Sequence, residues 1–310
     1  IMRGMREGNY QSKHRHTRSP ETGGTLAAFV AYGMWGLFPL YWKQLKHVES
    51  MQILAHRILW AAVFCLILML VWKRFSEIGK LLRQKRKFFI VFLASIVVTS
   101  NWGLYIWAVN IGRVVESALG YYINPLVSVL LGALFFKERV DPWTKLAVAL
   151  ATLGIVGAAV FYGSVRWVSL LWAVTFAIYG ALKKRVGIEP LISLAVETFT
   201  AAPFALAFLL SRQATGAGAF WNAGATTTLL LVMAGVVTAV PLFCFAQAPN
   251  SISLQKMGFI QYVSPCGQLF IGVVIYGEKP TAALLMAFAG VISAVIIYVF
   301  TRKRSVGSPG

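Results

Sequence analysis

The chain has 310 residues, of which 58% are apolar or aromatic and only 13% are charged. Its mean hydropathy is +0.70, and soluble domains carry about 25% charged residues. This composition excludes an ordinary soluble domain, a disordered chain, a collagen and a disulfide scaffold. Since one bilayer crossing takes about 20 apolar residues, the chain is predicted to be an all-α polytopic membrane protein.

In chain order, residues 1–24 are polar and basic and are expected to form an N-terminal tail without a cleavable signal segment. Apolar stretches then predict ten transmembrane helices, at 25–43, 51–72, 88–110, 114–136, 142–162, 167–183, 190–210, 226–248, 255–276 and 281–300. Residues 301–310 are expected to form a C-terminal tail on the same side as the N-terminal tail.

The net charge of +19 is mostly a topology signal. The Lys and Arg residues lie in short segments between apolar runs, so we expect no nucleic-acid partner. With ten crossings, 22 of the 29 basic residues lie on the side of the termini, six lie on the other side, and Arg57 lies inside a helix. The prediction is therefore a membrane protein with both termini in the cytoplasm.

An internal repeat divides the chain into two halves, 25–162 and 167–300. GYYINPLVSVLLGALFFKE begins at Gly120 and IQYVSPCGQLFIGVVIYGE begins at Ile260. An offset of 140 aligns Tyr122 with Tyr262, Pro125 with Pro265, Gly132 with Gly272 and Glu138 with Glu278. Because each half holds five helices, the second enters the membrane from the opposite face, as in many secondary transporters. Glu138 and Glu278 are interpreted as interfacial anchors.

Two charged residues fall at membrane depth, where ionisable groups usually have a function. The repeat makes Arg57 and Glu197 counterparts. One hypothesis is that they face a common cavity, pair when it is empty and exchange partners with substrate or with a coupling proton carried by Glu197. The alternatives are a fixed structural ion pair, or an Arg57 that reaches the headgroups. His56 is a further candidate substrate contact.

Polar and aromatic residues inside the predicted helices are the other candidates for a binding cavity. Asn101 and Tyr105 share a helix face, and prolines that break the hydrogen-bond ladder follow two further groups. The alternative is that these aromatic residues form interfacial belts. The candidates are Trp35, Asn101, Tyr105, Tyr121, Tyr122, Asn124, Tyr179, Gln261 and Tyr262, with Pro125 and Pro265 as helix-break positions.

Small residues four apart predict close helix packing. They are Ala147 and Ala151 in one helix and Ala283 and Ala287 in another, and they are expected to join the two halves or a dimer. No metal-binding, nucleotide-binding or nucleophile motif occurs, and the three cysteines lie inside apolar runs. We therefore expect no catalytic residue, metal or cofactor.

Several segments together resemble the drug/metabolite transporter superfamily, EamA-type, and in particular its RarD-like permeases. They are AYGMWGLFPLYWKQL from Ala31, ILAHRILWA from Ile53, NWGLYIWAVN from Asn101, ESALGYYINPLVSVLLGALFFKER from Glu116, SLLWAVTFAIYGALKKR from Ser169, PLISLAVETFTAAPFALAFLL from Pro190 and GFIQYVSP from Gly258. The resemblance implies an inner-membrane carrier with two five-helix halves and cytoplasmic termini. It also implies an association with chloramphenicol sensitivity or resistance.

The sequence thus predicts a secondary active transporter that exports a small organic metabolite or drug by alternating access, with protons as a candidate coupling ion. Export rests on family analogy alone. The alternatives are a passive channel and an intramembrane lipid-modifying enzyme. The expected partners are the small-molecule substrate and membrane lipid, and a homodimer stays open.

Overall fold

The computed structural model describes residues 19–110, 114–161 and 167–306, and their side chains except at 105–119 and 302–306. All regular elements of these ranges are helices. They are α1 (Pro20–Trp42), η1 (Lys43–Leu45), α2 (Ser50–Val71), α3 (Phe75–Arg83), α4 (Lys85–Asn110), α5 (Val114–Phe136), α6 (Pro142–Phe161), α7 (Trp167–Val186), α8 (Pro190–Ala214), α9 (Ala225–Gln247), η2 (Ala248–Asn250), α10 (Leu254–Gln261), α11 (Val263–Phe270), η3 (Ile271–Ile275) and α12 (Ala282–Val306).

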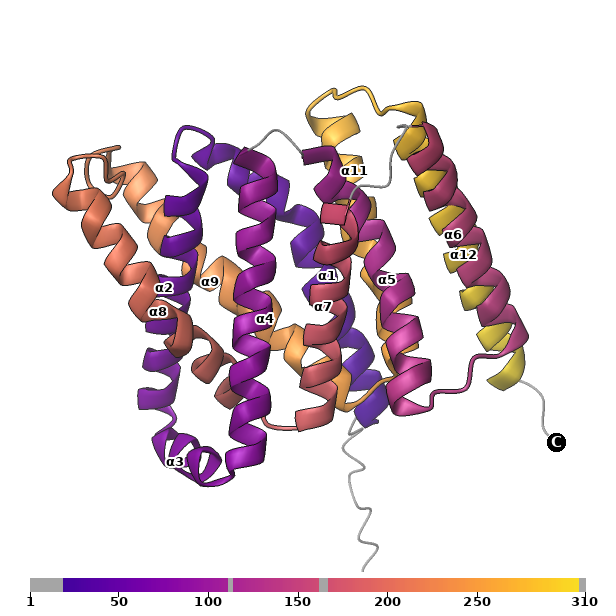
Figure 1. Cartoon of the computed structure of the whole chain (residues 1–310), viewed down its shortest axis with the longest axis horizontal. Coiled ribbons are helices and arrows are strands. Elements are labelled where there is room, and N and C mark those ends of the chain that lie inside the picture. The colour runs from indigo at the N-terminus through magenta and orange to yellow at the C-terminus, as the bar shows by residue number, and fades with distance from the viewer. Residues whose placement is uncertain (1–18, 111–113, 162–166, 307–310) are drawn as a thin grey trace, which may run out of the picture.

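The long helices lie side by side in a bundle (Figure 1). We call the end where α1 begins and α12 ends the terminal end, and the opposite end, which carries η1, the distal end. Eight described segments are long and apolar enough to cross a membrane, and Gly120–Phe136 within α5 is a shorter apolar helix. This confirms the polytopic all-α membrane fold. The number of ten crossings stays a prediction, since α7 does not reach the same hydropathy.

Three helices that start at the terminal end begin in the same way, with an oxygen-bearing side chain followed by proline. The oxygen accepts a hydrogen bond from a backbone N–H that has no partner inside the helix, and proline fits the first helical position. The pairs are Ser19 with Thr22, Asp141 with Thr144 and Glu189 with Ile192. These local signals set the start of α1, α6 and α8.

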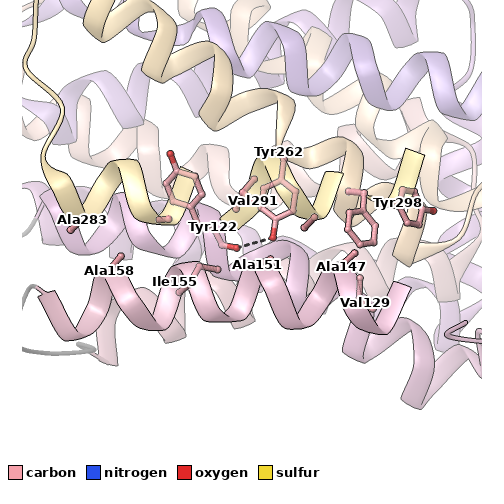
Figure 2. Close-up of a cluster of buried hydrophobic side chains, with 13 residues drawn as sticks. Tyr122, Val129, Ala147, Ala151, Ile155, Ala158, Tyr262, Ala283, Val291 and Tyr298 are labelled. Carbon is pink, nitrogen blue, oxygen red and sulfur yellow. Dashed lines mark hydrogen bonds between the residues drawn. The ribbon is translucent and has the colours of Figure 1, made fainter. Parts of the chain in front are cut away.

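The small residues of the sequence form the contact between α6 and α12. Ala147, Ala151, Ala283 and Ala287 are all fully buried, and Figure 2 shows the alanines of α6 turned towards α12. A Cβ atom added at Gly154 would lie 2.9 Å from the Cα atom of Gly290. Because α6 belongs to the first half and α12 to the second, this contact joins the two halves of one chain.

The two copies of the repeat end their helices with the same closure. The N–H of Glu138 donates to the carbonyl of Gly132 at 3.1 Å, and the N–H of Glu278 donates to that of Gly272 at 2.9 Å. The residue before each glutamate has a positive φ, 52° at Lys137 and 64° at Gly277. The first closure lies at the terminal end and the second at the distal end, so equivalent structures face opposite sides.

The two aligned prolines have different effects, which corrects the prediction that both break a helix. Pro125 lies inside the continuous α5. There the hydroxyl of Tyr262 donates to the carbonyl of Tyr122 at 3.3 Å, close to the gap that the missing proline N–H leaves. Near Pro265 the helix is interrupted at Tyr262, between α10 and α11, and η3 continues as a π-helix.

Candidate transport cavity

A cavity of about 490 Å³ extends from the middle of the bundle to the distal end. Its mouth carries the exposed Lys43, Lys46 and Glu278, and its inner part reaches the buried Asn101 and Gln261. Helices of both halves contribute to it. Aromatic side chains form much of the wall, namely Tyr32, Trp35, Phe38, Trp42, Trp102, Tyr121, Trp172, Phe176 and Tyr276.

Arg57 is the charged residue that reaches deepest into this cavity. Its Nε donates to Thr238 Oγ1 of α9 at 3.0 Å. The guanidinium lies over two indole rings, 4.7 Å from the centroid of Trp42 and 5.5 Å from that of Trp102. Such cation–π contacts hold a positive charge in a half-buried position. A ligand in the cavity would therefore contact a positive charge that is flanked by two indole rings.

Polar groups from α4 and α7 are locked together at the inner part of the cavity. The Asn101 amide donates to the carbonyl of Trp172 and to Thr175 Oγ1, each at 2.8 Å. The ring of Trp172 lies 4.1 Å from that of Tyr121, centroid to centroid. Since Asn101 has both N–H donors engaged by the protein, its side-chain oxygen is the group left for a ligand.

Below the cavity, an aromatic layer separates it from the terminal end. Tyr32 and Trp35 form its upper surface and line the cavity. Their rings contact Phe245, at centroid distances of 6.1 and 5.6 Å. Phe245 stacks on Tyr179 at 5.6 Å, and Phe176 contacts both at 5.6 and 5.9 Å. Tyr32, Tyr179 and Phe245 are fully buried, so the layer is closed to water.

Glu197 lies beyond this layer, and its ion-pair partner is Lys183. The ammonium Nζ of Lys183 lies 2.6 Å from Glu197 Oε1, and the two side chains are 3% and 4% exposed. The hydroxyl of Tyr179 donates to Glu197 Oε2 at 2.9 Å, and Ser193 hydrogen-bonds both charged groups. The predicted pairing of Glu197 with Arg57 is therefore wrong in this conformation, and Glu197 does not line the cavity.

The inverted repeat explains this error. Arg57 is the eighth residue of α2, which starts at the distal end, and Glu197 is the eighth residue of α8, which starts at the terminal end. At 1.5 Å per residue each lies about 10 Å inside its own end of the bundle. For a helix of about 33 Å this leaves about 12 Å between their depths. Counterparts in an inverted repeat share a depth only at the midplane.

The remaining candidates are divided between the cavity and the packed core. Trp35, Asn101, Tyr121 and Gln261 line the cavity. His56 is buried against Phe220, with ring centroids 5.2 Å apart, and its two nitrogens have no hydrogen-bond partner in the described part of the chain. Buried positions outside the cavity are those of Tyr122, Tyr262, Asn124 and Tyr179. The side chain of Tyr105 lies outside the described residues.

The terminal end is closed by Glu138, whose role exceeds that of an interfacial anchor. Its carboxylate accepts hydrogen bonds from the N–H groups of Leu254 and Gln255, at 2.8 and 3.1 Å, and so caps α10 of the other half. Lys184 Nζ lies 3.0 Å from the same carboxylate and donates to the carbonyl of Ile252. By contrast, the carboxylate of Glu278 has no hydrogen-bond or ion-pair partner among the described residues.

Sequence reasoning missed several residues of the cavity and of the buried network. Lys183 was counted only among the basic residues on the side of the termini, although it lies four residues after Tyr179 and so on the same helix face. Thr238 and Trp102 had no distinguishing signal, because only the fold brings them to Arg57. Across the described ranges, no three His, Cys, Asp or Glu side chains come together in a way that would hold a metal ion.

Comparisons with known proteins agree with this architecture. The model of the EamA-like transporter family matches twice, at residues 22–160 and 165–300. The chain is 42% identical over 285 residues to the uncharacterized transporter YojE of Bacillus subtilis, covering 91% of this chain and 95% of that protein. It is 35% identical over 286 residues to protein RarD of Escherichia coli, covering 91% and 97%.

A solved structure titled "Crystal structure of protein" matches with a TM-score of 0.69 at 20% identity, and covers 91% of this chain and 98% of that one. At this identity it supports the fold alone. The family match and the relatives identify a multi-pass membrane transporter. The chain belongs to the EamA-like transporter family of the drug/metabolite transporter superfamily, in its RarD-like branch.

Proposed function

We propose that this transporter is a secondary active carrier that exports a small organic metabolite or drug across the bacterial inner membrane by alternating access. With the termini in the cytoplasm, as the distribution of Lys and Arg predicts, the cavity faces the outside. Export instead of import follows the family resemblance. A volume of about 490 Å³ is in the range of pockets that bind medium-sized organic molecules.

The observation that carries the proposal is that the two copies of the repeat end in equivalent glutamates, of which one caps a helix and the other is exposed. At the terminal end Glu138 caps α10 and binds Lys184. At the distal end Glu278 stands exposed at the cavity mouth. Subtracting the offset of 140 from Leu254 gives Val114, the first residue of α5. We infer that Glu278 caps α5 when the distal end closes, while Glu138 releases α10.

The exchange of caps gives the two states similar free energies. A carboxylate at a helix N-terminus is worth about 0.3–1 kcal/mol when exposed and up to about 2 kcal/mol in partly buried geometries. Losing one cap and gaining the other therefore leaves a small net difference, which binding energy of a substrate is able to bias. A channel open at both ends would have no use for two mutually exclusive closures.

Glu197 has a structural part in this proposal instead of a proton-carrying one. Its carboxylate is held by Lys183, Tyr179 and Ser193 in the closed terminal half. Protonation would leave the lysine as an uncompensated buried charge. We therefore infer a fixed ion pair in this conformation, and a coupling proton, if one is used, enters when the terminal end is open.

Site-directed labelling tests the exchange and the orientation together. Ser50 lines the cavity near its mouth, and Asn250 is exposed at the terminal end. In a background with the three native cysteines replaced by alanine, we expect Ser50→Cys in intact cells to react with an impermeant maleimide. Asn250→Cys should react only after permeabilisation. The opposite pattern would reverse the predicted orientation.

The glutamates are then replaced one at a time. Glu138→Gln weakens the terminal closure and shifts the equilibrium between the two states by about five- to thirtyfold for 1–2 kcal/mol. Since the two states start close in free energy, labelling of Ser50→Cys should slow by about three- to fifteenfold. Glu278→Gln should leave the labelling rate of Ser50→Cys unchanged or raise it, because the distal closure is weakened. Glu77→Gln, on α3, is the matched control and should have no effect. Equal effects of Glu138→Gln and Glu278→Gln, or none, would contradict the exchange.

Counterflow in liposomes separates a carrier from a channel. A thermal-shift screen of metabolites and chloramphenicol on the purified protein first supplies a labelled ligand. A carrier preloaded with unlabelled ligand accumulates labelled ligand transiently against its gradient, whereas a channel only equilibrates it. We expect accumulation with the wild type and slower accumulation in both Glu138→Gln and Glu278→Gln, since each variant disfavours one of the two states.

A further inference from the structure

The segment between α2 and α4 has a charge pattern that transport does not use. It contains seven Lys and Arg residues and one acidic residue, Glu77, between Trp72 and Phe88. Within it α3 lies crosswise at the terminal end, beneath α2 and α4 (Figure 1). The sequence had suggested only a basic loop here, so the helix is an unexpected element with an ordered surface.

One face of α3 is anchored to the bundle. Leu81 is 4% exposed and belongs to the same apolar cluster as Val91 and Leu191, against which Ile78 also packs. Arg74 links α3 to the connection between α7 and α8, since it lies 2.6 Å from Glu77 of α3 and 3.0 Å from Glu189 of that connection. The orientation of α3 is therefore fixed by the protein itself.

A second strip of α3, about 80° around the helix axis from the anchored residues, is apolar and exposed. Phe75 and Leu82, seven residues apart and thus on one strip of the helix, are 40% and 51% exposed. Lys80 and Arg83 lie on the adjoining strip and are also exposed. A helix that presents apolar residues beside basic ones, and lies crosswise to the bundle, fits the boundary between acyl chains and headgroups.

The protein neutralises only a small part of the segment's positive charge. Arg74 has acidic partners, but in the part of the chain that the structure describes the six other cations have no ion pair. They are Lys73, Lys80, Arg83, Lys85, Arg86 and Lys87. Trp72, exposed at the end of α2, adds an aromatic residue of the kind enriched at membrane interfaces.

We propose that this face of α3, with the basic residues that flank it, is a docking surface for anionic phospholipid headgroups. Phe75 and Leu82 enter the acyl boundary, while Lys80, Arg83 and the lysines and arginine at the start of α4 bind the phosphates. A free anion would gain nothing from the apolar strip, and a zwitterionic lipid would gain little from the cations. The combination selects a lipid that is both amphiphilic and negatively charged.

Native mass spectrometry of the purified full chain tests the proposal with two lipids of identical acyl chains, phosphatidylglycerol and phosphatidylcholine. We expect the wild type to bind phosphatidylglycerol more tightly, and high salt to weaken this preference. The variant Lys80→Gln/Arg83→Gln/Lys85→Gln/Arg86→Gln should lose phosphatidylglycerol affinity by at least about tenfold, because each basic residue near the surface contributes. Its affinity for phosphatidylcholine should not change.

The matched control exchanges the same four residues for the other cation, Lys80→Arg/Arg83→Lys/Lys85→Arg/Arg86→Lys, and should bind both lipids like the wild type. Phe75→Ser/Leu82→Ser should weaken binding of both lipids. Equal affinity of the wild type for the two lipids would overturn the proposal, as would unchanged phosphatidylglycerol binding by the glutamine variant. Displacement of the lipid by equimolar inorganic phosphate would also overturn it, because a simple anion site would then suffice. The assay requires no transport, so its result is independent of the carrier mechanism.

Discussion

The buried pair of Lys183 and Glu197 gives the most quantitative prediction of the structure. Replacing Lys183 with Met leaves Glu197 with two hydrogen-bond donors, from Tyr179 and Ser193. Replacing Glu197 with Leu leaves Lys183 with Ser193 alone and removes the acceptor of the Tyr179 hydroxyl. Each single variant thus keeps one charge in a site that is about 96% buried.

The expected loss of unfolding free energy follows from these remaining contacts. Removing one partner of a buried ion pair costs about 3–5 kcal/mol, whereas replacing both with apolar residues is often neutral. We place Lys183→Met near the lower limit, because the carboxylate keeps two donors, and Glu197→Leu near the upper limit, because two polar groups lose their partner. The double variant Lys183→Met/Glu197→Leu should be much more stable than the sum of the single losses predicts.

Equilibrium unfolding in mixed detergent micelles measures the stabilities of the wild type, the two single variants and the double variant, which together form a double-mutant cycle. As control, Arg57→Met combined with Glu197→Leu should be additive within about 0.5 kcal/mol, because distant sites without shared partners do not couple. Additive losses for Lys183 and Glu197 would refute the pairing argued here. Strong coupling between Arg57 and Glu197 would instead support the pairing that the sequence suggested.

Two further predictions concern packing and pH. Gly154→Val should cost about 1–3 kcal/mol of unfolding free energy, because its Cβ would lie 2.9 Å from the backbone of Gly290. The control is Gly157→Val in the same helix, whose Cβ would meet nothing within 4 Å. Thermal unfolding in detergent compares the two variants, and equal losses of stability would contradict the close contact. Burial raises the pKa of Asp141, but hydrogen bonds from Thr144, from the backbone of Trp143 and from its own backbone together outweigh burial and leave this pKa below its usual value. A lowered pKa stabilises the fold above about pH 4, so Asp141→Ala should cost about 0.5–2 kcal/mol at pH 7 and progressively less as the pH falls below 4.

The arrangement of helices was largely predictable from the sequence because membrane spans are encoded by local composition. Apolar runs, acceptor–proline helix starts and small residues four apart all act over one helix. The exceptions were elements that depend on contacts. The helix α3 forms because Leu81 packs into the bundle. A helix break was predicted at both Pro125 and Pro265, and only the helix that contains Pro265 is interrupted, at Tyr262.

The cavity was less predictable because it depends on which side chains meet across helices. Membrane depth alone singled out Arg57 and Glu197, and both are engaged in the structure, but with partners that no spacing rule supplied. Aromatic residues were recognised as candidates without distinguishing Trp35, which lines the cavity, from Tyr122, which is in the core. The repeat showed which positions of the two halves are equivalent, but only the fold shows at what depth in the bundle each position lies.

The same inversion relates the charges of the two halves to the two states of a carrier. In this conformation the closed terminal half keeps Lys183 and Glu197 out of water, at a desolvation cost offset by their mutual contact. The open distal half leaves Arg57 half-buried at the cavity wall, with its guanidinium over two indole rings. In the exchange of ends that we propose, the ion pair would regain water and Arg57 would lose it. On this proposal one set of charges is hydrated while the other is buried, so the electrostatic costs of the two states oppose each other and bring the states close in free energy, as the proposed alternating access requires.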